Sequence, residues 1–377
     1  MKSLLLVGSF ADSLLNFRGP LIAALLEKGI RVHVAAPGLG QHTVQRKALE
    51  TLGVIVHDLY MARTGMNPIT DIRTLWNMFR LIKSIAPDAV LAYTIKPVIY
   101  GVIAAKIARV PHIFALITGL GYAFQSKGSR ITRSIAQLLY RFSLSRAEKV
   151  FFQNPDDKQL FLQRKIISSN VPAVVVNGSG VDLDFFKPAV PPTQPAHFLL
   201  IARLLGSKGV REYVQAAEII KQKHADVCFS LAGWIDSNPD SISETELSNW
   251  IQTGTINFLG KLADVRPALQ ACSVYVLPSY REGTPRTVLE AMSIGRAIIT
   301  TDAPGCRETV IHGKNGFLVP IQSAESLASA MEIFIKDTAL IISMGRESRD
   351  IVEQKYDVRK VNEFMLAEMK VHALSDI

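Results

Sequence analysis

The sequence predicts an α/β fold made of two doubly wound, Rossmann-like domains that face each other across a cleft. Short β-branched or leucine-rich runs alternate with helical patterns, which is typical of parallel sheets covered by helices on both faces. The alternation stops at a proline-rich segment, residues 187–197, and then restarts. A chain of 377 residues is also long enough for two domains. We therefore expect domains at residues 1–187 and 188–357, followed by a C-terminal helix, residues 358–377, that returns to the first domain.

The first half holds seven short runs with the length and composition of buried strands. They are Lys2–Val7, Arg31–Ala35, Val54–His57, Ala89–Ala92, His112–Leu116, Val150–Phe152 and Ala173–Val176. Helical patterns lie between them at Pro20–Lys28, Val44–Leu52, Ile69–Ile85 and Val98–Ala108. Sheets of this kind bind ligands at the carboxyl ends of their strands, so the residues that follow each run are candidates for a site.

The second half repeats the pattern after the linker KPAVPPTQPAH, whose four prolines cannot continue a helix or a central strand. The predicted strands are Phe198–Ala202, Val227–Leu231, Ile256–Phe258, Val274–Leu277, Ala297–Thr300 and Phe317–Val319. The predicted helices are Val210–Lys223, Arg286–Ile294, Ala324–Ile335, Leu340–Lys355 and Val358–His372. Clefts between domains are preferred ligand sites, so we expect the site there.

Composition excludes several classes of protein. With 48% hydrophobic and 20% charged residues, the chain is not disordered. Three cysteines are too few for a disulfide framework and fit no zinc pattern, which favours a reducing compartment. The apolar run Leu4–Val7 is too short for a signal peptide, and no uncharged apolar run reaches about 18 residues. We expect a cytoplasmic protein without a transmembrane helix.

The strongest local signal is PSYREGTPRTVLE, residues 278–290, which leads from a strand into a helix. Gly283, Thr284 and Pro285 lie at the turn, where free backbone N–H groups favour a polyhydroxylated or anionic ligand. Glu282 would accept hydrogen bonds from sugar hydroxyls, and Glu290, one turn into the helix, from a vicinal diol such as ribose. An ordinary solvated helix start with two carboxylates is the alternative.

A second signal, ARLLGSKG at residues 202–209, follows the first strand of the second domain and opens its first helix. Arg203 and Lys208 place two cations beside a helix N-terminus, an arrangement that suits a pyrophosphate. The alternative is a surface arginine and lysine on a glycine turn. Asp182 and Asp184 formally match a DxD metal motif, but their place before the linker favours a turn. No His or Cys cluster has ligand spacing, so no metal is expected.

Together these segments resemble the family 4 glycosyltransferases, which have the two-domain GT-B fold. The similarity is greatest to bacterial enzymes that extend polyprenyl-diphosphate-linked glycans, among them N-acetylgalactosaminyltransferases. The matching segments of the second half are the Glu282–Glu290 and Arg203–Lys208 pairs, NGSGVD (177–182), DAPGCRE (302–308) and GKNGFLVP (313–320). Those of the first half are FRGP (17–20), YTIKPVIYG (93–101) and TGLG (118–121).

The resemblance implies a role for each matching residue. Arg203 and Lys208 would neutralise the donor diphosphate, and Glu290 would bind the nucleotide ribose. Glu282 and the turn at residues 283–285 would hold the donor sugar. Such hexosyltransferases are typically retaining, use a UDP-sugar as donor, and need no metal or cofactor. The leaving phosphate helps to deprotonate the acceptor hydroxyl, so no enzymic nucleophile is required.

The first domain would bind a lipid-linked glycan acceptor. Arg18 and Lys96 are its candidate cations, and Thr118, Gly119 and Gly121 are candidate cleft residues. The sequence departs from many relatives at Thr118, because they carry a donor-contacting histidine in that region. Two alternatives remain open: a nucleotide-sugar epimerase of the same fold, and a non-catalytic protein that binds sugar nucleotides.

Charge is distributed unevenly along the chain. Residues 1–187 have a net charge of +12 and residues 188–377 of −3, and no acidic residue lies between Asp88 and Glu148. Within that gap, Ser129–Arg146 has the pattern of a basic amphipathic helix. Its apolar positions are Ile131, Ile135, Leu138, Leu139 and Phe142, and its flanking arginines are Arg130, Arg133 and Arg141. This pattern predicts peripheral binding to an anionic membrane surface at the inner face of the cytoplasmic membrane, with an ordinary core-facing helix as the alternative.

Nucleic acid is disfavoured as a partner because aromatic residues do not cluster with the cations.

Overall fold

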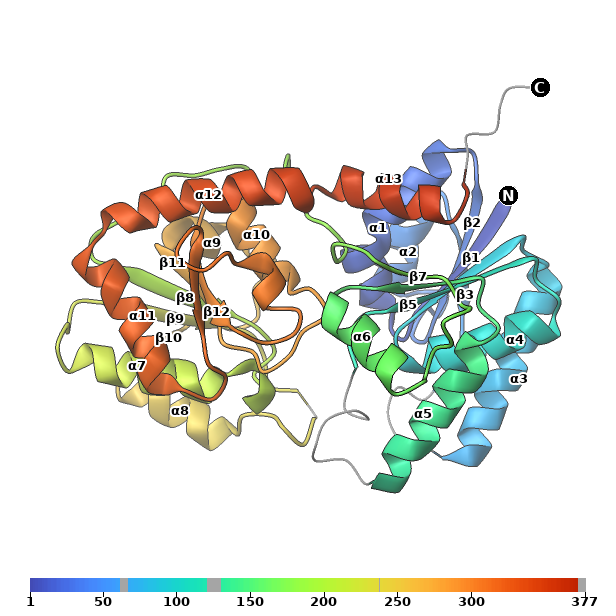
Figure 1. The fold of residues 1–377 in the computed structure, drawn as a ribbon, viewed down its shortest axis with the longest axis horizontal. Helices are drawn as coiled ribbons and strands as arrows, with labels where there is room; N and C mark the ends of the chain where they lie inside the picture. The colour runs from blue at the N-terminus through green and yellow to red at the C-terminus, as the bar shows by residue number, and fades with distance from the viewer. Residues whose placement is uncertain (62–66, 121–129, 237, 372–377) are drawn as a thin grey trace. The chain divides into compact units, whose positions relative to one another are not determined.

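The computed structural model describes residues 1–61, 67–120, 130–236 and 238–371, with only the backbone of residues 130–132. The chain forms two compact units (Figure 1). The first comprises Met1–Ser179 and Arg359–Ile377, and the second comprises Gly180–Val358. Each unit has a parallel sheet with helices on both faces, so the predicted doubly wound α/β class is confirmed.

The sheet of the first unit has seven parallel strands in the order β3-β2-β1-β4-β5-β6-β7. The strands are β1 Ser3–Val7, β2 Arg31–Ala36, β3 Ile55–Asp58, β4 Ala89–Tyr93, β5 His112–Ile117, β6 Lys149–Phe152 and β7 Ala173–Val175. Successive residues of a strand point to opposite faces, so Leu4 and Leu6 of β1 enter one core while Leu5 and Val7 enter the other.

Two sets of helices cover the two faces of this sheet. The core that contains Leu4 is closed by α1 Ala11–Glu27, α2 Val44–Thr51 and α13 Val358–Glu368. The opposite core is closed by α3 Pro68–Ile85, the π-helical turn Pro97–Gly101, α4 Val102–Ile107, α5 Arg130–Leu144 and α6 Pro155–Gln163. The C-terminal helix α13 therefore packs on the sheet that begins the chain.

Helix α1 begins nine residues before the predicted start at Pro20. A proline inside a helix removes one backbone hydrogen bond, which is why the sequence favoured a start at this residue. The apolar face nevertheless continues across it, because Leu14, Leu21 and Leu25 are all buried in the same core. Burial of this face outweighs the lost hydrogen bond.

The second unit has a six-stranded parallel sheet in the order β10-β9-β8-β11-β12-β13. Its strands are β8 His197–Ile201, β9 Cys228–Ala232, β10 Asn257–Phe258, β11 Val274–Leu277, β12 Ala297–Thr301 and β13 Gly316–Val319. The helices are α7 Val210–Lys221, α8 Glu244–Gln252, α9 Arg266–Ala271, α10 Arg286–Ile294, α11 Ala324–Lys336 and α12 Ala339–Lys355. One face packs against α7, α8 and α11, and the other against α9 and α10.

The proline-rich segment lies within the second unit, and the division falls before Gly180 instead of at residue 187. Backbone hydrogen bonds explain this: the Val181 N–H donates to Tyr356 at 2.9 Å, and the Ala189 N–H donates to Ile294 at 3.0 Å. Between these two points, the Asp182 carboxylate accepts hydrogen bonds from the backbone N–H groups of Asp184 and Phe185, each at 2.9 Å. The predicted turn at Asp182–Asp184 is thus confirmed.

Candidate functional site

Strand order places both sequence signals of the second unit at one point. The chain winds outward from β8 in one direction through β9 and in the other through β11, so the topological switch lies between β8 and β11. Arg203 and Lys208 follow β8, and residues 278–285 follow β11. Open α/β sheets bind ligands at this position. The two predicted halves of a donor site are therefore neighbours.

The two loops are joined by polar contacts. The Lys208 ammonium forms an ion pair with the Glu282 carboxylate, and their side chains are 20% and 13% exposed. The Tyr280 backbone N–H donates to the Ser207 carbonyl at 2.9 Å. A cation suited to a phosphate and a carboxylate suited to sugar hydroxyls thus lie in direct contact at the switch point.

Glycines permit this close approach. A Cβ on Gly209 would lie 2.2 Å from the Pro278 carbonyl oxygen, and a Cβ on Gly305 would lie 2.3 Å from that of Glu282. Both glycines have positive φ values, of 71° and 83°, which side chains rarely adopt. The loop after β8 and the loop after β12 can therefore contact the loop after β11 only because these residues lack a side chain.

Two carboxylates that were not predicted lie beside the cationic loop. Arg203 Nη1 donates to Asp236 Oδ2 at 2.9 Å, and the Ser207 backbone N–H donates to Asp240 Oδ2 at 2.7 Å. Both aspartates come from the segment between β9 and α8, which reads in sequence only as a polar loop. In this structure, then, protein carboxylates contact the groups that we expect to bind a diphosphate.

Glu290 is nearly buried in α10, which begins just after Pro285. Burial raises the pKa of its carboxyl, although the neighbouring Arg286 guanidinium opposes the shift. Arg286 Nε donates to Glu290 Oε1 at 2.9 Å. The sequence analysis did not predict Arg286 as a site residue. Its i, i+4 spacing from Glu290 could have indicated this contact, because residues four apart lie side by side on a helix. Gly283 and Thr284 lie in the turn between Glu282 and this helix.

The first unit has its own switch point between β1 and β4. Lys96 follows β4 and forms an ion pair with Asp71 of α3 at 2.9 Å, with both side chains 11% exposed. Arg18 is buried in α1, its guanidinium carbon 5.0 Å from the centroid of the Tyr93 ring. Burial raises the pKa of Tyr93 to about 12, and its hydroxyl lies 2.7 Å from Ser13 Oγ. Both predicted acceptor cations are thus held beside β4.

The remaining predicted acceptor residues follow β5. Thr118 and Gly119 come directly after its last residue and are partly exposed. They lie at the carboxyl edge of the same sheet as Lys96. Gly121 falls outside the described residues. The strand order places β5 next to β4, so Thr118 and Lys96 follow adjacent strands.

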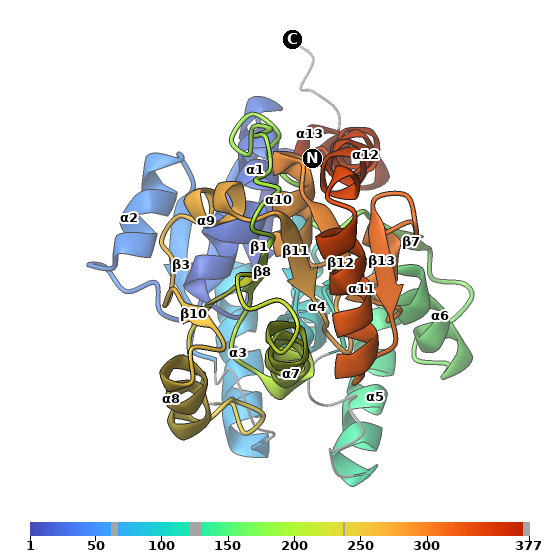
Figure 2. The same cartoon turned by 90° about the vertical axis from the view of Figure 1, so that its left-hand side faces the viewer.

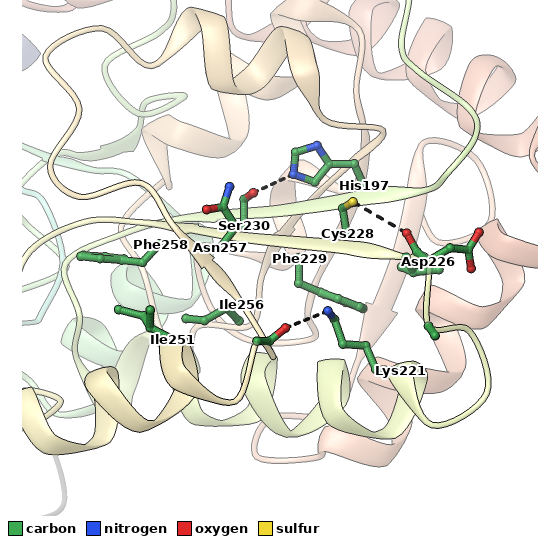
Figure 3. Close-up of a pocket in the computed structure, with 13 residues that line it drawn as sticks. His197, Lys221, Asp226, Cys228, Phe229, Ser230, Ile251, Ile256, Asn257 and Phe258 are labelled. Atoms are coloured by element: carbon green, nitrogen blue, oxygen red, sulfur yellow. Dashed lines mark hydrogen bonds between the residues drawn. The ribbon is translucent and has the colours of Figure 1, made fainter.

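A pocket of about 540 Å³ lies elsewhere in the second unit (Figure 3). His197, Cys228 and Asn257 line it, and they are the first residues of β8, β9 and β10. It therefore opens at the amino edge of the sheet, opposite the edge that carries Lys208 and Glu282. Polar side chains that line the pocket form hydrogen bonds with other lining residues, such as His197 Nε2 with Ser230 Oγ at 2.8 Å. This pocket is distinct from the candidate site.

Two features are absent from the described part of the chain. No group of three or more His, Cys, Asp or Glu side chains there is arranged to hold a metal ion. No helix there combines the length and apolar character needed to cross a bilayer.

Comparison with known proteins identifies the two halves of the chain. Residues 4–154 match the family described as glycosyl transferase 4-like, and residues 195–337 match glycosyl transferases group 1. A similar curated protein is the N,N'-diacetylbacillosaminyl-diphospho-undecaprenol alpha-1,3-N-acetylgalactosaminyltransferase of Campylobacter jejuni. It is 28% identical over 91% of this chain and 94% of its own. The Escherichia coli UDP-Gal:alpha-D-GlcNAc-diphosphoundecaprenol alpha-1,3-galactosyltransferase is 25% identical over 78% of this chain and 77% of its own.

Solved structures share the fold. Anabaena HepE in complex with UDP superposes with a TM-score of 0.77 at 20% identity, covering 99% of this chain and 100% of its own. Sucrose-phosphate synthase from Thermosynechococcus elongatus gives a TM-score of 0.79 at 17% identity, covering 98% of both chains. These similarities confirm the predicted GT-B fold.

Proposed function

Because the chain belongs to the glycosyltransferases of the GT-B fold, we propose that it moves a sugar from a UDP-sugar to a polyprenyl-diphosphate-linked glycan. The names of the Campylobacter and Escherichia coli relatives both include a diphosphate-linked undecaprenol acceptor. The observation that carries the proposal is the contact of Lys208 with Glu282 at the switch point of the second unit. There, a cation that would bind phosphate lies against a carboxylate that would bind sugar hydroxyls.

Each residue would act through ordinary electrostatics and hydrogen bonding. Arg203 and Lys208 would stabilise the negative charge that develops on the departing diphosphate, exchanging Asp236 and Glu282 for phosphate oxygens. Glu290 would accept hydrogen bonds from the ribose, and Glu282 and the turn at residues 283–285 would orient the sugar. The acceptor oxygen would bond to the anomeric carbon on the face from which the diphosphate departs, and the departing phosphate would take the proton of the acceptor hydroxyl. Attack on that face gives retention at the anomeric carbon.

A panel of UDP- and GDP-sugars tests the proposal, with polyprenyl-diphosphate sugars as acceptors. We expect transfer from at least one UDP-sugar and an unchanged anomeric configuration in the product, read by NMR. Interconversion of donors without any acceptor would indicate an epimerase. Binding of UDP without turnover of any donor would indicate a sensor, and either outcome would overturn the transferase proposal.

The same proposal places the first unit on an anionic membrane surface, because two of its helices expose apolar stripes. On α3, Ile69, Ile72 and Trp76 are 79%, 68% and 57% exposed. On α5, Ile135, Leu138 and Phe142 are 45%, 66% and 49% exposed. Each set follows the same i, i+3, i+7 spacing, which defines one face of a helix. We call these six residues the apolar stripes.

The apolar stripe of α5 does not face the core. Among residues 133–144 of this helix, whose side chains the structure describes, the buried ones are Ala136, Tyr140, Ser143 and Leu144. The side of the helix that faces the core is therefore a different one from the side that carries the apolar stripe. Both helices project from the same side of the first unit in two perpendicular views, and each contacts α4 (Figures 1 and 2). Helices of a parallel sheet begin at its carboxyl edge, so the start of α3 lies at the edge that carries Lys96. A lipid surface there would present an acceptor close to its candidate residues.

Charge on these two helices favours an anionic leaflet. Both helices carry cationic residues near the stripes in sequence: Arg73, Arg80 and Lys83 of α3, and Arg133, Arg141 and Arg146 on or beside α5. Arg146 lies over the Phe142 ring, 3.5 Å from guanidinium carbon to centroid. Cations near anionic lipid contribute about 1 kcal/mol each and weaken with salt, whereas each buried large apolar side chain contributes about 1.5–3 kcal/mol that salt does not screen.

Liposome co-sedimentation across a salt series tests this surface. The full chain should bind phosphatidylglycerol vesicles at low salt and retain part of that binding at high salt. Ile72→Glu with Trp76→Glu, or Leu138→Glu with Phe142→Glu, should abolish the salt-resistant part. The matched control is Ile333→Glu, an apolar residue of the second unit that is 41% exposed. Absence of binding at low salt, or equal loss in the control, would reject the membrane surface.

A further inference from the structure

Thr94 has an unusual backbone conformation at the carboxyl end of β4. Its φ is 68°, in the left-handed region. For a β-branched residue this is a genuine outlier, because its Cβ is crowded against the backbone. Glycine or asparagine would adopt the same conformation at a lower cost in stability. The backbone geometry therefore does not explain why this position carries threonine.

The conformation is fixed by the structure that follows. The Val98 backbone N–H donates to the Thr94 carbonyl at 3.0 Å, and the π-helical turn Pro97–Gly101 begins three residues after Thr94. Such π-helical turns, like strained residues, are frequent at functional sites. The turn also fixes Lys96, which pairs with Asp71.

The side chain of Thr94 carries the inference. Its hydroxyl oxygen is shielded from solvent and has no hydrogen-bond partner, although the residue as a whole is partly exposed. A shielded, unpaired hydroxyl destabilises a fold by about 1–3 kcal/mol unless it has a partner in the working protein. Staggered χ1 positions lie about 120° apart, so the hydroxyl would turn toward a ligand by a change of rotamer alone.

The surroundings indicate which ligand would do so. Thr94 lies at the switch point of the first sheet, next in sequence to Tyr93, whose ring carries the Arg18 guanidinium, and two residues before Lys96. Lys96 is paired with the Asp71 carboxylate in this structure, so an anionic oxygen would bind these cations by taking the place of that carboxylate on Lys96. We propose that the Thr94 hydroxyl donates a hydrogen bond to a diphosphate oxygen of the lipid-linked acceptor. This inference rests on the proposed transferase function and adds a binding residue to it.

Two substitutions separate the hydroxyl from the backbone. Thr94→Gly removes the hydroxyl and relieves the strain, so the melting temperature should stay the same or rise. Binding of N-acetylglucosaminyl-diphospho-undecaprenol in detergent should nevertheless weaken about 10-fold or more, the loss expected for one hydrogen bond to a charged oxygen. Thr94→Ser keeps the hydroxyl and should bind this probe within about twofold of the unaltered protein. A threonine with a purely structural role would not produce this contrast.

The matched control is Ala86→Gly, at the C-terminus of α3, three residues before β4 begins. Ala86 also has a positive φ, of 48°, and it is exposed. This variant should leave binding of the diphosphate probe unchanged. An alkyl glycoside of N-acetylglucosamine, which lacks the diphosphate, should not distinguish Thr94→Gly from the unaltered protein.

Several outcomes would overturn the inference. The first is that Thr94→Gly binds the diphosphate probe as tightly as the unaltered protein does. The second is that Thr94→Ser weakens probe binding as much as Thr94→Gly does. The third is that Thr94→Gly changes the affinity for UDP but not for the probe. UDP affinity and transfer by the unaltered protein are measured in parallel. Their absence would refute the proposed function, whereas normal transfer with unchanged Thr94→Gly binding would refute only the role of Thr94.

Discussion

In the candidate donor site, charged side chains are shielded from water and compensated by ion pairs. Lys208 and Glu282 are both largely shielded and neutralise each other, and Glu290 is shielded further and neighbours Arg286. A shielded charge that loses its partner keeps its desolvation cost. Substitutions at these residues therefore change stability and ligand binding in separable ways.

Lys208→Ala should lower kcat/KM by about 100-fold, because it removes a cation from the departing diphosphate. It should also lower the stability of the protein, since the Glu282 carboxylate loses its ion-pair partner. Adding Glu282→Gln to Lys208→Ala should recover part of the stability without restoring activity. Thermal melts and steady-state kinetics of both variants check this, and full recovery of activity would contradict the assigned role.

Glu290 gives a prediction about pH. Its pKa is raised by burial, so the folded protein holds this proton more tightly than the unfolded chain. The group stabilises the fold below the ordinary glutamate pKa, and this contribution is lost as pH rises through the raised value. Glu290→Gln cannot lose a proton at this position. The melting temperature of this variant, relative to that of the unaltered protein, should therefore rise as pH increases from about 4. A difference that does not vary with pH would contradict the raised pKa.

The same residue links pH to nucleotide binding. Protonation removes an acceptor that the ribose hydroxyls would use, so uridine affinity should fall as pH is lowered through the raised pKa of Glu290. In Glu290→Gln this dependence should disappear, and uridine affinity should be lower at neutral pH. Isothermal titration with uridine, whose phosphate-free structure avoids titration of the ligand, measures both effects.

At the scale of elements, the loops after β8 and β11 meet because Gly209 leaves room for the Pro278 carbonyl. Gly209→Ala should destabilise the fold by more than the roughly 1–2 kcal/mol of a left-handed alanine, and it should weaken UDP binding. Gly254→Ala is the matched control, since Gly254 has a φ of 68° and open space around it. Urea unfolding and UDP titration compare them, and equal effects would show that the close approach does not matter.

At the scale of the whole molecule, the last helix completes the core of the first unit. Met365, Leu366 and Met369 of α13 are buried there, and Lys149 Nζ donates to the Glu368 carbonyl at 2.8 Å. Residues more than 200 positions apart thus share one core. The stability of the first unit therefore depends on residues that follow the second.

Met365→Ala should destabilise the first unit by about 2–5 kcal/mol, the usual cost of truncating a buried methionine. Phe364→Ala, at a neighbouring position that is 42% exposed, should change stability by no more than about 0.5 kcal/mol. Hydrogen–deuterium exchange should show faster exchange in β1 and β2 for Met365→Ala only. UDP affinity, which we assign to the second unit, should stay unchanged in both variants.

The sequence by itself determined the α/β class and every strand that the structure describes, and it indicated the segments in which we expect the site. Strand length, helical periodicity and local turns are encoded by neighbouring residues. The sequence also indicated the basic, amphipathic character of α5, but not which apolar residues face outward. Only the tertiary structure decided that. It likewise revealed the partners Asp236, Asp240 and Asp71, and the left-handed Thr94 with its unpaired hydroxyl. These features depend on strand order and on packing between segments distant in the chain, and local sequence patterns contain no record of either.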